Sequence, residues 1–196
     1  MASVAGSSHV RSAVPCQDRS RCAVIDSDGK DVLMAVAADG AGSASRAEEG
    51  AQLTCESFIK TMAPLLSIDD GVENVTQAVA SAWLNDFQQD IAQRADLTGS
   101  HVRDFACTFL AAIVGPAAAV FLQIGDGAIV VSPCDEPEEF SWIFWPKKGE
   151  YENQTTFVTD VSAEGRLNYE LVRTRIDEVA LFTDGLQRLA LHMVDQ

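Results

Sequence analysis

Residues 106–132 read ACTFLAAIVGPAAAVFLQIGDGAIVVS, an almost uninterrupted apolar stretch. It contains three apolar runs of strand length, Cys107–Val114, Ala118–Ile124 and Ile129–Val131. Gly115-Pro116 separates the first two runs, and Gly125-Asp126-Gly127 separates the second from the third. Short apolar runs bounded by glycine and proline turns are typical of buried strands. We therefore predict a meander of three antiparallel strands in this stretch.

Further strands are predicted on both sides of this meander. Before it, Cys22–Ile25 and Val32–Ala38 enclose the segment Asp26–Lys30, whose Asp28-Gly29 pair is a hairpin turn signal. After it, the sequence predicts short strands at Trp142–Trp145, Thr155–Val158, Leu167–Arg173 and Val179–Thr183, and a helix over Leu186–Val194.

Two helices are predicted between these groups of strands. The first carries apolar residues at helical spacing from Ala51 to Leu66, with a capping box at Ser45 and Glu48 and a kink or end at Pro64. The second has the pattern Val72, Val75, Val79, Trp83, Phe87 and Ile91, with Asp70 and Glu73 as its caps. Helices grouped between clusters of strands favour an α+β fold over alternating βαβ units.

Composition limits the classes of function. The chain has 196 residues, enough for a single domain over 1–196, and its 29 acidic residues outweigh 14 basic ones for a net charge of −15. Such a chain is repelled by nucleic acid and by anionic membrane surfaces, so we expect neither as a partner. No apolar run approaches membrane-helix length, and the N-terminus lacks a signal-peptide pattern. The five cysteines, without metal-ligand spacing, are interpreted as reduced, mostly buried thiols of a cytoplasmic protein.

Three aspartates share one local pattern. Asp39, Asp126 and Asp184 each follow an apolar run and each precede a glycine, so each carboxylate is expected where a buried strand emerges. Asp28 and Asp70 also precede glycine, but their polar or capping contexts indicate ordinary turns. Any one of the three taken alone would also be read as a turn, whereas the three together favour a shared site.

Oxygen ligands of this kind suit Mg²⁺ or Mn²⁺. Zinc is disfavoured, because the histidines are isolated from one another and from the cysteines. Two such ions can activate a water molecule and hold an anionic substrate, for which a phosphate ester is the natural class.

The N-terminal segment adds a fourth carboxylate, Asp18. Arg11 could clamp a phosphate, or it could equally be an exposed surface arginine. His9 could donate a hydrogen bond near the site, or it could serve a structural role.

The ordered set Gln17-Asp18, Ala38–Ser43, Gly125–Gly127 and Thr183–Gly185 resembles the metal-dependent serine/threonine protein phosphatases of type 2C. The resemblance runs from about Gly6 to the C-terminus and is strongest to the bacterial branch. Additional residues that resemble this branch are Trp145-Pro146, Gly149-Glu150-Tyr151, Asn153 and Thr155-Thr156-Phe157.

The resemblance implies a four-layer αββα sandwich, in which two antiparallel β-sheets are flanked by helices on both outer faces. It implies that Asp39 bridges two ions of Mg²⁺ or Mn²⁺, with the Gly40 carbonyl on one ion and Asp184 on the other. Asp18 would hold metal-bound water or bind directly. Asp126 would lie behind these ligands or bind a third ion. The nucleophile would be a metal-bridging hydroxide.

The sequence departs from the family pattern at three places. Ala41 stands where many members carry histidine, and Gln17 stands where others carry glutamate. The chain also ends at Gln196, before the last Asp-containing motif of the family, so we expect its C-terminal elements and one ligand to be missing.

Three functional hypotheses follow. The first is hydrolysis of phosphoserine and phosphothreonine in proteins, in a bacterial signalling role opposite a serine/threonine kinase, as the resemblance implies. The second is a catalytically impaired module that keeps this fold and binds a partner or a phosphoprotein. The third is an unrelated α+β protein whose Asp-Gly pairs are turns.

Overall fold

The computed structural model describes residues 15–68, 71–136, 138–144 and 155–185. Several predictions fall outside these ranges. They concern His9, Arg11, the cap at Asp70, the motif residues 145–154 and the helix over 186–194.

The first two strands form the predicted hairpin. Strand β1 (Arg19–Ser27) pairs antiparallel with β2 (Lys30–Ala38), and both are longer than the sequence pattern indicated. Asp28 and Gly29 form the two-residue turn with positive φ angles of 50° and 76°. The Gly29 N–H donates to the Asp26 carboxylate over 2.8 Å. The Asp28-Gly29 pair predicted this turn correctly because the turn is defined by local backbone geometry.

The hairpin belongs to a five-stranded antiparallel sheet in the order β1-β2-β3-β4-β7. Strands β3 (Phe109–Val114) and β4 (Ala119–Ile124) occupy its centre, and β7 (Asn168–Val172) lies at the edge. Every residue of β4 is buried, because other layers cover both faces of this sheet. A strand buried on both faces has a continuous apolar sequence, which is why residues 106–124 carried so clear a signal.

The third strand of the predicted meander lies in a different sheet. Strand β5 (Ala128–Pro133) pairs with β8 (Ile176–Phe182) and with the short β6 (Ser141–Trp142), in the order β6-β5-β8. Gly125, with φ of 103°, turns the chain from the first sheet to the second instead of back along β4. The meander prediction was therefore wrong beyond Ile124. A Gly-Asp-Gly turn does not specify whether the next strand finds its partner in the same sheet.

The two helices lie where the apolar spacing placed them, but their caps differ from the prediction. Helix α2 (Ala47–Leu66) has Arg46 at its N-cap position without a side-chain cap, so the Ser45–Glu48 capping box was wrong. Pro64 stands in the last turn.

Helix α3 (Gln77–Thr98) is capped by Thr76, whose hydroxyl accepts from the Val79 N–H. Val72 and Val75 are buried ahead of the helix. Glu73 pairs with Arg173 instead of capping. Burial of these valines explains why they mimicked the helical spacing.

Two short 3-10 helices complete the described elements, η1 (Val102–Phe105) and η2 (Glu164–Arg166). The predicted strand at Thr155–Val158 is wrong. The Phe157 N–H donates to the Asp160 carboxylate over 2.8 Å, and the Val158 N–H donates to the Cys107 carbonyl over 2.9 Å. This apolar segment is therefore held in a turn. The Asp160 carboxylate accepts the hydrogen bond from the Phe157 N–H that a neighbouring strand would otherwise accept.

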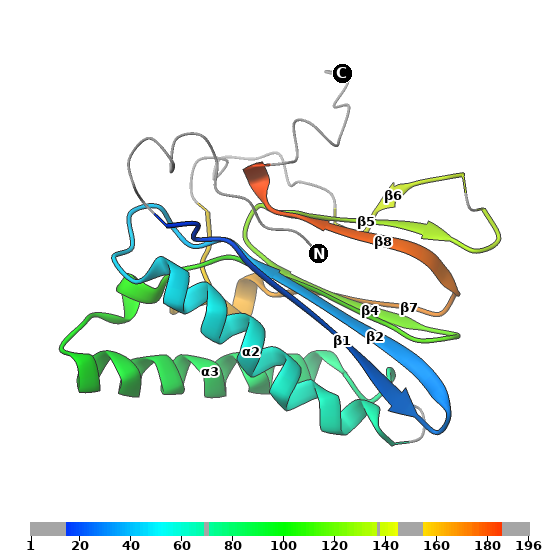
Figure 1. Cartoon of the computed structure of the whole chain (residues 1–196), viewed down its shortest axis with the longest axis horizontal. Coiled ribbons are helices and arrows are strands. Elements are labelled where there is room, and N and C mark those ends of the chain that lie inside the picture. The colour runs from blue at the N-terminus through cyan, green and yellow to red at the C-terminus, as the bar shows by residue number, and fades with distance from the viewer. Residues whose placement is uncertain (1–14, 69–70, 137, 145–154, 186–196) are drawn as a thin grey trace.

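The layers are helices, first sheet and second sheet (Figure 1). Helices α2 and α3 cover one face of the first sheet through a core that includes the contacting rings of Phe58, Trp83 and Phe109. The other face packs on the second sheet through Leu110, Phe121 and other side chains. The fold is α+β with two antiparallel sheets, as predicted. The helical layer expected on the outer face of the second sheet stays a prediction.

None of the five cysteines, which all lie in the described ranges, forms a disulfide, but the expectation of mostly buried thiols holds only for Cys55 and Cys107. Burial raises the pKa of each of these two thiols to about 12. In the ranges that the structure describes, no helix is long and apolar enough to cross a membrane.

Candidate metal centre

The β1–β2 hairpin brings the first two acidic residues together. Arg19 pairs with Ala38 at the open end of the hairpin, so the next residue of each strand, Asp18 and Asp39, lies just beyond the last pair. The Gly40 N–H donates to the Gln17 carbonyl over 3.3 Å, which continues the contact between the two chain segments. Residues distant in sequence thus meet because a register places them opposite one another.

The backbone of Asp39 is held against the segment that leads into β3. Its N–H donates to the Thr108 hydroxyl over 3.1 Å, and its carbonyl accepts from the Thr108 N–H over 2.8 Å. The Ala41 N–H donates to the Ala106 carbonyl over 2.9 Å. Hydrogen bonds on both sides of Gly40 therefore hold Asp39 and Ala41 to the segment that enters β3, and the Asp39 carboxylate projects from a backbone fixed by these bonds.

Gly40 permits a close approach of α2 to this loop. A Cβ atom at Gly40 would lie 2.8 Å from the Ala47 Cβ and 2.9 Å from the Ala47 carbonyl oxygen, closer than packing allows. Ala41, at the position where many family members carry histidine, is only 8% exposed and packs in a small cluster with Ala44, Ala47 and Ala106. Small residues here seat the first turn of α2 beside the acidic centre.

Asp184 arrives from the second sheet. It follows β8, whose Phe182 pairs with Ala128 at the start of β5. Gly127 packs against this strand end, because a Cβ atom there would lie 2.9 Å from the Phe182 carbonyl oxygen. The end of β8 is thus positioned by the turn that carries Asp126.

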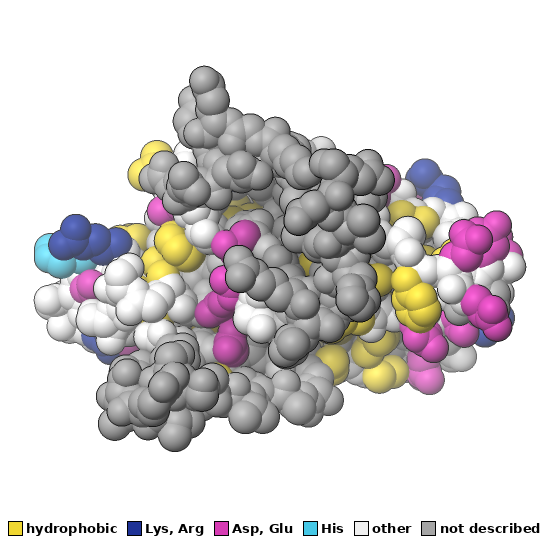
Figure 2. All heavy atoms as spheres, turned by 90° about the horizontal axis from the view of Figure 1, so that it is seen from above, with side chains coloured by type: hydrophobic (Ala, Val, Ile, Leu, Met, Phe, Trp, Pro, Cys, Tyr) yellow, Lys and Arg dark blue, Asp and Glu magenta, His cyan; other side chains and the backbone are white. Residues whose placement is uncertain are grey.

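Asp39 is the common member of the acidic group. Burial and the negative charges of Asp18 and Asp184, together with hydrogen bonds to both, raise the pKa of the Asp39 carboxyl to about 8. The structure therefore brings together three of the four predicted carboxylates, as two pairs that share Asp39. Figure 2, seen from the side of the second sheet, shows acidic side chains near the middle of this face.

The chemistry of these residues fits a divalent cation. Carboxylates that crowd one another are stabilised when a cation lies between them, and all-oxygen ligands suit Mg²⁺ or Mn²⁺. Within the described ranges, however, no three acidic, histidine or cysteine side chains form a ready-made ligand set around one point.

Asp126 lies apart from this group in its interactions. It is exposed, and its carboxylate accepts from the Thr155 hydroxyl over 2.8 Å. It is not one of the groups that shift the pKa of Asp39. Its turn is nevertheless tied to the centre, because a Cβ atom at Gly125 would lie 2.6 Å from the Thr108 Cγ2. The side chain of Gln123 holds the same turn by donating to the Gly125 and Gly127 carbonyls over 3.2 and 2.8 Å.

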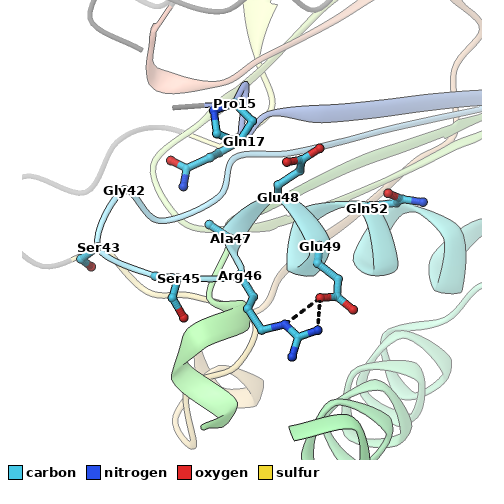
Figure 3. Close-up of a pocket in the computed structure, with 11 residues that line it drawn as sticks. Pro15, Gln17, Gly42, Ser43, Ser45, Arg46, Ala47, Glu48, Glu49 and Gln52 are labelled. Carbon is cyan, nitrogen blue, oxygen red and sulfur yellow. Dashed lines mark hydrogen bonds and ion pairs between the residues drawn. The ribbon is translucent and has the colours of Figure 1, made fainter. Parts of the chain in front are cut away.

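A pocket of about 580 Å³ opens beside the Asp39 loop (Figure 3). It lies at the N-terminus of α2 and is lined by Pro15, Gln17, residues 42–49 and Gln52.

Comparison with known proteins decides the family. The family model described as Protein phosphatase 2C matches residues 5–195. The Escherichia coli K12 protein named serine/threonine-protein phosphatase 3 is 37% identical over 195 residues, which cover 99% of this chain and 75% of that protein. The chain belongs to the protein phosphatase 2C family. The resemblance inferred from the sequence motifs is thereby confirmed.

Solved structures support the fold of this family member. The crystal structure of a bacterial serine phosphatase matches with a TM-score of 0.61 at 14% identity, over 91% of this chain and 76% of that chain. The serine/threonine phosphatase of Staphylococcus aureus matches with a TM-score of 0.59 at 14% identity, over 91% and 74%. At such low identity the likeness concerns the architecture alone.

Two residues of this phosphatase 2C chain were not predicted as part of the centre. Thr108 supports both Asp39 and Gly125, and its signal was a hydroxyl inside the apolar run 106–114. The side chain of Gln17 lines the pocket, whereas the sequence marked this position only as one where others carry glutamate.

Proposed function

We propose that this chain hydrolyses phosphoserine and phosphothreonine esters in proteins and that Mg²⁺ or Mn²⁺ is required. Its membership of the phosphatase 2C family and its 37% identity to a serine/threonine-protein phosphatase support the reaction. The observation that carries the metal requirement is that Asp18 and Asp184 both lie against the partly buried Asp39, whose pKa is raised to about 8.

Asp39, Asp184 and Asp18 would hold the cations, with Asp39 shared between two of them and the Gly40 carbonyl as a further ligand. Ions bound there would activate water for attack on phosphorus and neutralise the phosphate charge. Asp126, held by Thr155, is proposed as an auxiliary residue or as a ligand of a third ion. Arg11 and His9 remain proposed contacts of the substrate phosphate.

The chain's own contribution is to orient these groups. Thr108 fixes the backbone of Asp39, so the carboxylate does not need to reorganise when a cation binds. Ala41 places no imidazole next to the Asp39-Gly40 pair, so we assign the proton that the leaving alkoxide needs to water. Ionised Asp39 is the form that binds a cation, and its raised pKa makes cation binding compete with a proton.

The proposed substrates are phosphoproteins that a serine/threonine kinase has modified, in a cytoplasmic signalling role. Neither the family match nor the relatives favour the non-catalytic module as an alternative.

Release of phosphate from a phosphothreonine peptide tests the proposal. We expect hydrolysis that depends on Mn²⁺ and that Asp39→Asn lowers kcat/KM at least about 100-fold, because residues that only support metal ligands already cost about 10- to 100-fold. Asp28→Asn is the matched control. It makes the same change in an Asp-Gly pair, in the β1–β2 turn, where asparagine tolerates positive φ. An inactive wild-type chain, or equal rates for Asp39→Asn and wild type, would contradict the proposal.

A further inference from the structure

The pocket at the N-terminus of α2 lies directly beside the acidic centre. Gln17 on its wall precedes Asp18, and Gly42 on its opposite wall is three residues from Asp39. Three residues of extended chain span at most about 10 Å. A group bound in this pocket is therefore within a few residues' reach of a phosphorylated side chain at the centre.

The charged residues of the pocket are already paired. Glu48 forms an ion pair with Arg19. Glu49 forms an ion pair with Arg46 over 2.7 Å (Figure 3) and a second ion pair with Arg94. Because each carboxylate has its cation, the pocket retains little preference for either an acidic or a basic ligand.

Gln17 is one of the neutral polar residues that line the pocket, together with Ser43, Ser45 and Gln52. The residue is only 9% exposed, its side chain lines the pocket, and Figure 3 shows the amide projecting over the opening toward Gly42. Within the described part of the chain, this amide forms no hydrogen bond, whereas its backbone carbonyl accepts from Gly40. The amide atoms face the open pocket and are not buried away from water, so a bound ligand can accept and donate their hydrogen bonds.

We propose that this pocket binds the main chain of the phosphoprotein beside its phosphorylated residue, with the Gln17 amide pairing with a peptide group. The inference rests on the proposed function. A carboxamide offers one acceptor and two donors, which matches the C=O and N–H of a peptide group. A neutral ligand suits a pocket whose charges are paired. Recognition of the backbone would let one pocket accept many phosphoprotein sequences.

The test compares two phosphate esters, one with a peptide main chain and one without. The substrates are a neutral phosphothreonine peptide of alanine, glycine and serine, and p-nitrophenyl phosphate, which has no main chain. For Gln17→Met, which keeps the side-chain length and removes the amide, we expect the ratio of kcat/KM for the peptide to that for the aryl ester to fall about fivefold, the effect of one hydrogen bond. Gln89→Ala, at an exposed position of α3, is the control and should keep the wild-type ratio.

Equilibrium binding separates this inference from the proposed function. Without added metal, fluorescence polarisation should show about fivefold weaker binding of the labelled phosphopeptide to Gln17→Met than to wild type. N-methylation of the peptide bonds beside the phosphothreonine should weaken binding to wild type and have less effect on the variant. If these binding differences are seen but no variant or wild type hydrolyses the peptide, the proposed function is overturned while the role of the pocket in peptide binding is supported. The proposed role of the pocket would be overturned if a folded Gln17→Met kept the wild-type kcat/KM ratio and binding affinity. It would also be overturned if kcat/KM fell equally for both esters.

Discussion

Asp39 is the residue whose ionisation is most strongly opposed by the other carboxylates of this site. Its carboxyl is partly buried and faces the charges of Asp18 and Asp184, so ionisation is disfavoured and its pKa rises from 3.8 to about 8. In an unfolded chain the same group would ionise near its ordinary value. A cation between these carboxylates would reverse the preference, because it stabilises the ionised form.

This shift predicts that the metal-free protein loses stability as pH rises. Between pH 4 and 8 the folded chain keeps the Asp39 proton while the unfolded chain has lost it, so the free energy of unfolding falls through this window. Urea denaturation in the presence of a chelator, at pH 5 and pH 8, measures the effect. Asp39→Asn, which cannot ionise, should show a smaller difference between the two pH values.

Added Mn²⁺ should raise the stability of the wild-type protein more at pH 8 than at pH 5, because the cation competes with the proton. Equal pH dependence in wild type and in Asp39→Asn would show that another group is responsible.

At the scale of elements, close backbone contacts position the centre. Gly40 and Gly50 both lie where α2 approaches another segment, the Asp39 loop in one case and η1 in the other. Gly125 and Gly127 do the same for the turn between the two sheets. Glycine is required at such positions because even a methyl group would push the segments apart.

Gly50→Ala should therefore destabilise the protein, although alanine is the better helix former. Its Cβ would overlap the Phe105 carbonyl oxygen and lie 2.7 Å from the carbonyl carbon, so α2 or η1 must move. We expect a loss of at least about 2 kcal/mol in the free energy of unfolding, as for other overpacked sites. Gly165→Ala is the control, since nothing lies within 4 Å of its added Cβ, and it should change stability by less than about 0.5 kcal/mol. Equal thermal midpoints for the two variants would contradict this assignment.

At the scale of the whole molecule, the first sheet forms the centre between the helices and the second sheet (Figure 1). Strands β3 and β4 have neighbours on both edges and cover on both faces, whereas β6 is two residues long at the edge of the second sheet. Amide hydrogen exchange should consequently be slowest in β3 and β4, with rates at least about 100-fold below those in β6. Exchange in β3 that is as fast as in β6 would show that the first sheet is not the stable core.

Local sequence patterns were enough to predict two kinds of element, turns defined by their own backbone geometry and strands that are buried on both faces. The Asp28-Gly29 turn requires only its own two residues, and the central strands are apolar throughout because both their faces are covered. The order of Gln17-Asp18, Asp39-Gly40, Asp126 and Asp184 was enough to identify the phosphatase 2C family, because the motifs occur together. The cap at Thr76 was missed because buried valines ahead of α3 continued its apolar spacing.

The sequence by itself thus determined the family, the fold class and the residue types of the candidate centre. Only the tertiary structure decided that β5 joins β8 in a second sheet, that Asp18 and Asp184 meet at Asp39, and that Asp126 instead contacts Thr155. The reason is that strand partners and close approaches depend on segments far apart in the chain. Contacts between distant segments also place Gln17 beside a pocket in which the charged side chains are paired, and no local sequence pattern encodes this arrangement.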